Sequence, residues 1–330
     1  MATQTQSLSG ELKISRAQIG RLVAEFGLLA MLILLVALFT AANPRFLTLA
    51  NLTTLIQQNA ALFIVAVAAT FAIISRQIDL SPGSLIALSG TVLGLVFQAT
   101  GSILLGIAAG FTTCFAVELL HGALIAKLNL NPLIVTLATW IWARGLAVSL
   151  TNASSILVRD PLTTFITSDL GSGISPSILL IGVAYLAGWF VLNKTRLGRY
   201  TFAIGSDERA TIQAGIDTVC YKILMFVLFA LFVGVAMLIT VSRLGAAAPD
   251  AAYGLELDAI VAVIIGGNPF QGGEGSLRRT FIGALFIAVL NNGLSNLGML
   301  DSQIAVYKGA TILLALLLGV AGARLVRGRQ

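Results

Sequence analysis

Residues 223–241 read ILMFVLFALFVGVAMLITV, a run without a charged side chain or a proline. At 1.5 Å per residue, a helix of this length covers about 28 Å, close to the hydrocarbon core of a bilayer. Similar runs recur along the chain, and only 10% of its 330 residues are charged. Soluble domains carry roughly 25% charged residues. The sequence therefore predicts an all-α, polytopic membrane protein.

The apolar runs predict about ten transmembrane helices. We place them at Leu22–Ala42, Asn59–Ser75, Gly83–Ala99, Ile103–Leu120, Pro132–Leu150, Ser177–Leu192, Ile223–Val241, Leu257–Gly267, Thr280–Leu297 and Ile304–Ala321. The eighth run is too short to span alone, so we expect a broken or re-entrant helix whose free backbone groups face protein or water. A single transmembrane domain over 22–321 then separates an N-terminal segment, 1–21, from a C-terminal tail, 322–330.

The basic residues indicate the orientation. With a cytoplasmic N-terminus and ten crossings, fifteen of the 20 Lys and Arg residues fall on the cytoplasmic side. The other five, on or near the opposite side, are Arg45, Arg144, Arg159, Arg243 and Lys308. Cytoplasmic loops of membrane proteins carry an excess of Lys and Arg, so both termini are expected in the cytoplasm. The net charge of +6 is explained by this topology and does not indicate a nucleic-acid partner.

The composition disfavours catalysis by this chain. His121 is the only histidine, which excludes a multi-histidine metal site and the usual Ser-His-Asp triad. The two cysteines, Cys114 and Cys220, do not have metal-ligand spacing. We therefore expect neither a metal site nor an intramembrane enzyme, and we interpret His121 as a capping or interface residue at its helix C-terminus.

Between the second and third runs, Asp79, Ser81 and Pro82 form a helix-start signature. A carboxylate or hydroxyl satisfies the free N–H groups of a helix, and proline suits its first turn. Two interpretations remain open. The segment is either a capping turn or a polar loop positioned near a translocation path.

Further polar residues stand where lipid-facing sequence would not place them. The Asn131-Pro132 pair ends one helix and starts the next, and Thr136 and Thr139 share a face of that helix. These threonines bond either a polar solute or their own i−4 carbonyl groups. Asp258 opens the short eighth run, where a carboxylate must be hydrated, paired or capping. Together with Asn292 of the ninth run, these residues are candidates for the lining of a solute path.

The longest polar connection runs over residues 193–221. Ser206 is predicted to cap a short amphipathic helix with Asp207 and Glu208 in its first turn, and Gly215 to end it. This helix is either a docking element for a soluble partner or a helix lying in the membrane surface.

Several of these segments together resemble the permease subunits of the ribose-type ATP-binding-cassette (ABC) sugar importers of bacteria. The segments are IDLSPGS (78–84), GALIAKLNLNPLIVTLAT (122–139), TRLGRYTFAIGSDERATIQAGI (195–216), LELDAIVAVIIGG (255–267), GGEGSLRRTFIGAL (272–285) and NNGL (291–294). The chain departs from the pattern at Arg76 and Gln77, where many relatives carry two glycines.

The resemblance implies a fold similar to the vitamin B12 importer's membrane subunit. It implies a monosaccharide permease in the bacterial inner membrane that is fed by a periplasmic binding protein and paired with a second permease subunit. A cytoplasmic ATPase would carry ATP and magnesium and dock on the loop over 193–221. The residues so implicated are Arg196, Gly198, Arg199, Gly205, Asp207, Glu208, Ala210 and Gly215. The sequence contains no G-x-x-x-x-G-K-[ST] motif, so this chain is not expected to bind ATP or another cofactor itself.

Two alternatives remain. One is a secondary transporter or channel for a small polar solute. Its strongest charged candidates within the membrane are Glu118, Arg144 and Lys308. Glu118 and Lys308 can also be placed near helix ends, with their charges reaching the membrane surface. The other is a permease of the same family for a nucleoside, polyol or signalling sugar.

Overall fold

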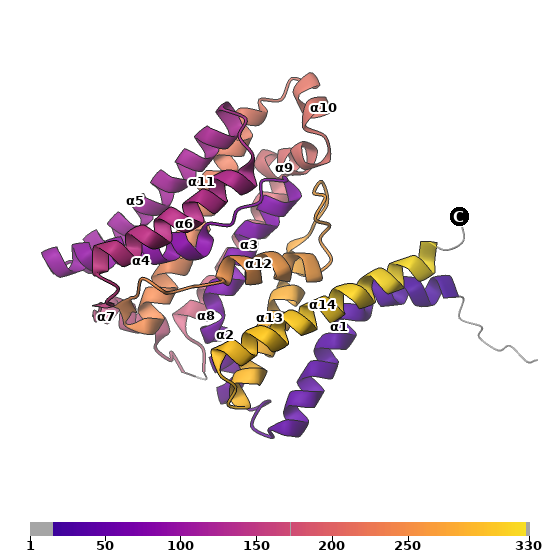
Figure 1. The fold of residues 1–330 in the computed structure, drawn as a ribbon, viewed down its shortest axis with the longest axis horizontal. Coiled ribbons are helices and arrows are strands. Elements are labelled where there is room, and N and C mark those ends of the chain that lie inside the picture. The colour runs from indigo at the N-terminus through magenta and orange to yellow at the C-terminus, as the bar shows by residue number, and fades with distance from the viewer. Residues whose placement is uncertain (1–15, 172, 328–330) are drawn as a thin grey trace, which may run out of the picture.

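The computed structural model describes residues 16–171 and 173–327, which are mostly helical (Figure 1). The helices are α1 (Arg16–Ala42), α2 (Leu49–Gln58), α3 (Ala60–Ile74), α4 (Pro82–Thr100), α5 (Ile103–Gly122), α6 (Pro132–Thr151), α7 (Pro161–Thr167), α8 (Pro176–Lys194), α9 (Arg196–Ser206), α10 (Glu208–Gln213), α11 (Thr218–Leu244), α12 (Leu255–Ile265), α13 (Leu277–Asn296) and α14 (Asp301–Arg327). A helix therefore lies at each apolar run.

Five of the described helices, α4, α5, α6, α8 and α11, are long and apolar enough to cross a membrane. A sixth span is added if α2 and α3, which meet at a bend of 50°, count as one. The eighth run forms α12, whose 11 residues cover only about 16 Å. Its expected shortness is confirmed.

Helix α3 is the centre of the bundle, because every one of its residues except Ala61 is buried. It packs against α8, α11, α12 and α13, while α4 packs against α5, α6 and α11. The sequence of α3 is entirely apolar apart from Thr70. A helix that is apolar all round must be covered on every side, and its neighbours supply that cover.

The first and last helices form a flank of their own. Figure 1 shows α1 and α14 side by side at the edge of the bundle, and both contact α13. The chain's N-terminal and C-terminal helices therefore stabilise each other.

Two irregular features position the site. Helix α5 continues as one turn of π-helix, η1 (Ala123–Lys127), before the chain turns into α6. Beyond α6, β1 (Ile156–Leu157) pairs antiparallel with β2 (Ala246–Ala247), which follows α11. This short ladder ties the end of α6 to the segment that leads into α12.

Candidate functional site

The connection at 193–221 contains two helices, α9 and α10, instead of the single helix that was predicted. Ser206 is the last residue of α9 and does not cap α10, so that prediction was wrong. The cap is Asp207, whose Oδ1 accepts a hydrogen bond of 3.0 Å from Ala210 N–H. A carboxylate there also interacts favourably with the positive end of the helix dipole. Gly215, at φ +78°, follows the end of α10 as expected.

One face of α9 is seated on the transmembrane helices through two glycines. A methyl group at Gly198 would collide with the main-chain oxygen of Leu192, and one at Gly205 would collide with that of Ile74. Both glycines are buried. They are packing residues within this chain and do not form part of an exposed docking surface.

The remaining predicted docking residues face outward. Arg196, Arg199, Asp207, Ala210 and Gly215 are exposed, and Glu208 is half-buried. The Glu208 carboxylate lies 2.6 Å from Lys222 Nζ, which ties α10 to α11. Beside them is a cleft of about 620 Å³, lined by Arg76, Asn129, Ser206, Asp207, Glu208, Arg209 and Ile212.

Arg76 joins this surface to the loop that follows α3. Its guanidinium donates hydrogen bonds to the main-chain oxygens of Gln271 and Ser206. The N–H of Gly273 donates to Ile74 O at 2.8 Å. The end of α9, the end of α3 and the glycine-rich turn between α12 and α13 therefore form one bonded unit.

The loop before α4 has the predicted helix start. Asp79 Oδ1 accepts a hydrogen bond of 2.7 Å from Ser81 N–H, and α4 begins at Pro82. Thr136 of α6 reaches this loop, because its Oγ1 lies 2.9 Å from Pro132 O and 3.5 Å from Ile78 O. Asp79 thus closes a turn just before α4, but no side chain caps the helix itself, because Ser81, its N-cap residue, makes no side-chain capping hydrogen bond. Asp79 and Ser81 are also buried, at 7% and 0% exposure.

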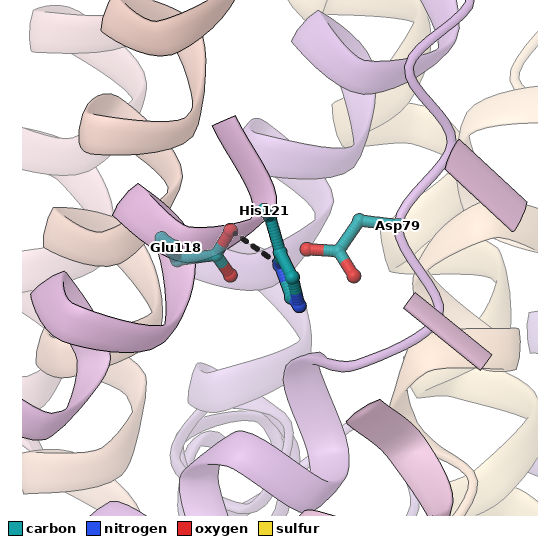
Figure 2. A group of neighbouring side chains, drawn as sticks. All are labelled: Asp79, Glu118 and His121. Carbon is teal, nitrogen blue, oxygen red and sulfur yellow. Dashed lines mark hydrogen bonds and ion pairs between the residues drawn. The ribbon is translucent and has the colours of Figure 1, made fainter. Parts of the chain in front are cut away.

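Asp79 meets two residues of α5 (Figure 2). Figure 2 shows the carboxylates of Asp79 and Glu118 on either side of the His121 ring. His121 Nδ1 lies 3.1 Å from Glu118 Oε2, and Nε2 lies 2.8 Å from Thr139 Oγ1. His121 and Glu118 are fully buried, so His121 does not cap its helix and Glu118 does not reach the membrane surface. In the sequence, only the i, i+3 spacing of Glu118 and His121 indicates that these two side chains lie on one face of a helix.

The other predicted path residues lie apart from this cluster. Asn131 is exposed and caps α6 through a 2.9 Å bond from Leu133 N–H. Asp258 is paired with Lys308 of α14 at 2.8 Å, so the Lys308 charge is bound within the protein. Asn292 accepts hydrogen bonds from the side-chain amides of Asn51 and Asn296. Of the seven path candidates, Asp79, Ser81, Thr136 and Thr139 come together.

A second carboxylate, Glu256, was missed as a site residue. Trp140 Nε1 donates a 2.8 Å hydrogen bond to its Oε1, which joins α6 to α12. Glu256 and Asp79 line the same small cavity, whose volume of about 10 Å³ is near that needed for one water. Trp140 is half-buried, and its indole N–H is bonded inside the protein. The sequence feature that could have identified Glu256 as a site residue is its position two residues before Asp258, at the start of the same short apolar run.

The chain is 36% identical over 317 residues to the ribose import permease protein RbsC of Escherichia coli (strain K12), covering 95% of this chain and 98% of the relative. It is 35% identical over 318 residues to RbsC of Bacillus subtilis (strain 168), covering 96% and 98%. It is 32% identical over 298 residues to the D-allose transport system permease protein AlsC of Escherichia coli (strain K12), covering 89% and 91%.

No solved structure matches the chain. Residues 51–321 match the family model described as branched-chain amino acid transport system / permease component. This match covers all the helices from α3 to α13. Together with relatives above 30% identity over almost their full length, it shows that the chain belongs to the branched-chain amino acid transport system / permease component family.

Proposed function

We propose that this chain is the membrane-spanning permease subunit of an ABC importer that moves a monosaccharide across a bacterial inner membrane. The observation that carries the proposal is 36% identity over 95% of the chain to a protein named as a ribose import permease. Relatives named for D-allose and L-arabinose support a sugar of this class. The chain itself performs no catalysis in this proposal.

We also propose ten crossings, with both termini in the cytoplasm, in a fold similar to that of the vitamin B12 importer's membrane subunit. Support comes from the helix at each of the ten apolar runs and from the cytoplasmic excess of Lys and Arg. The short α12 is tolerated inside the bundle because α3, α4, α13 and α14 surround it. Its free backbone ends then face protein instead of lipid.

The energy for transport would enter through α9 and α10. A cytoplasmic ATPase, which holds ATP and magnesium, would dock on the exposed residues Arg196, Arg199, Asp207 and Ala210. Movement of α9 would pass to the loop after α3, because Gly205 rests on Ile74 and Arg76 bonds to Ser206. The same loop carries Asp79 towards Glu118 and His121 of α5 (Figure 2). A displacement of α9 thus biases the position of buried polar groups and shifts the equilibrium between inward-facing and outward-facing states.

A periplasmic binding protein and a second permease subunit complete the proposed importer. The outer ends of α4 and α6 present a cleft of about 580 Å³ near the β1–β2 ladder, on the side opposite to α9 and α10 in the proposed topology. This cleft suits a soluble partner that arrives from the periplasm, because its lining is more polar than a lipid-facing surface.

The test is uptake of radiolabelled ribose, allose and arabinose in cells that lack their own importers for these sugars. The chain is expressed with its cognate ATPase and binding protein, or with an ATPase that cannot hydrolyse ATP. We expect uptake of at least one sugar only with the active ATPase. Equal uptake with the inactive ATPase would support a secondary transporter or channel instead, and uptake of nucleosides or polyols alone would overturn the assignment of a sugar.

A further inference from the structure

The cluster of Asp79, Glu118 and His121 has the composition of a metal site. Each residue offers one ligand atom, and the three atoms lie within 4.8 Å of one another (Figure 2). All three side chains are at least nine-tenths buried. They come from two parts of the chain, the loop before α4 and the end of α5.

Two oxygens in this cluster lack donors. Among the described residues, neither Glu118 Oε1 nor Asp79 Oδ2 has a hydrogen-bond partner. Each belongs to a carboxylate that is buried, and a buried acceptor without a donor is costly. The described residues place no Lys or Arg in an ion pair with either carboxylate.

The hydrogen bonds of Thr139 orient the imidazole. Its Oγ1 lies 3.2 Å from Val135 O and 2.8 Å from His121 Nε2. A hydroxyl has one proton and the Val135 carbonyl only accepts, so making both bonds requires Thr139 to accept from Nε2–H. A neutral His121 then presents the Nδ1 lone pair to Glu118 Oε2. Metal-binding histidines are typically held in this way, with the other ring N–H donated to a neighbouring group.

We propose that Asp79, Glu118 and His121 bind one divalent transition-metal cation, with Zn²⁺ the preferred ion. One +2 charge neutralises both carboxylates, and each of the three residues offers it one ligand atom. A proton on Nδ1 would serve only Glu118 Oε2 and would leave one negative charge without compensation. The nitrogen ligand favours Zn²⁺ over Mg²⁺ and Ca²⁺, which prefer oxygen alone.

The ligands need only a small rearrangement. Zn²⁺ bonds of about 2.0–2.2 Å place tetrahedral ligands roughly 3.4 Å apart, so the widest pair must close by up to about 1.4 Å. The bound ion would fix the loop before α4 to α5, and through Thr139 to α6. This inference does not depend on the proposed transport function.

The experiment uses the full chain in lipid nanodiscs, purified by an affinity tag without histidines and stripped with a chelator. After equilibrium dialysis against Zn²⁺ alone, elemental analysis should find about one zinc per chain in the unmodified protein. Glu118→Gln and His121→Asn should each lower this to background, while Glu274→Gln, at an exposed carboxylate, should retain it.

Co²⁺ gives a second measurement that does not require a folded variant. Co²⁺ bound to the unmodified protein should show the visible bands of a tetrahedral site, and added Zn²⁺ should abolish them. Absence of those bands, or zinc contents that are equal in all four proteins, would overturn the proposal in favour of protons as the counter-charges.

Discussion

Gly205 of α9 lies directly against the main-chain oxygen of Ile74, the last residue of α3. The same oxygen accepts the N–H of Gly273 from the turn between α12 and α13. One carbonyl group is therefore contacted by α9 and by the glycine-rich turn at the end of the central helix α3. A side chain at position 205 would push these three segments apart.

Substitution of Gly205 by Val is expected to destabilise the permease. The Cβ of Val would collide with main-chain atoms, which cannot rotate away, so the cost is at least about 1–3 kcal/mol, typical of overpacking. Thermal melting of the purified protein in detergent should show a lower midpoint. Gly182→Ala is the matched control, because no atom lies within 4 Å of the added methyl group. Equal melting temperatures for the two variants would contradict the packing seen here.

Ala210 tests ATPase docking more directly than the buried glycines of α9, because a substitution at Ala210 does not disturb packing within the chain. It is exposed on α10, so Ala210→Arg should leave folding unchanged and still obstruct a partner surface. We expect co-purification of the ATPase and sugar uptake to fall together by at least about tenfold, which corresponds to 1.4 kcal/mol of docking energy. Ala210→Ser is the control of similar size. Undiminished uptake in Ala210→Arg would place the docking surface elsewhere.

Local signals in the sequence predicted some features correctly. Asp79 accepts the N–H of Ser81, two residues away, and the fixed φ of Pro82 suits the first turn of a helix, so the start of α4 follows from the sequence. The apolar runs likewise predicted where helices lie, because burial or lipid contact requires apolar side chains over the whole length of a helix.

Features that depend on distant partners were missed. Glu118 and His121 sit in an apolar helix, and their contacts at positions 79 and 139 are brought near only by the packing of α4, α5 and α6. Gly198 was assigned to a docking surface because a sequence does not reveal which face of a short helix is covered. Both errors arose from tertiary contacts that hydropathy does not encode.

The hydrogen bond from Trp140 to Glu256 should couple α6 to α12 energetically. Trp140→Phe removes the donor from a buried carboxylate oxygen, and Glu256→Met removes the acceptor and leaves the indole N–H without a partner. Each single substitution is expected to cost about 1–3 kcal/mol, the range for a buried group left without a partner. The double variant should cost less than the sum of the two. A double-mutant cycle on thermal stability measures this coupling, and additive effects would show that the bond contributes nothing.

Substitutions of the ion pair between Lys308 and Asp258 can distinguish a structural role of the pair from a role in ion-coupled transport. Their side chains are 22% and 17% exposed, so removal of either charge leaves the other partly buried without its counter-ion. We expect Lys308→Met or Asp258→Asn alone to lower stability by about 1–3 kcal/mol, less than for a fully buried pair because water screens part of the charge. The double variant Lys308→Met with Asp258→Asn should recover most of the loss, and uptake should recover with it, because the pair then only joins α12 to α14. If the double variant is stable but does not transport, the charges act in transport itself, as a secondary transporter would require.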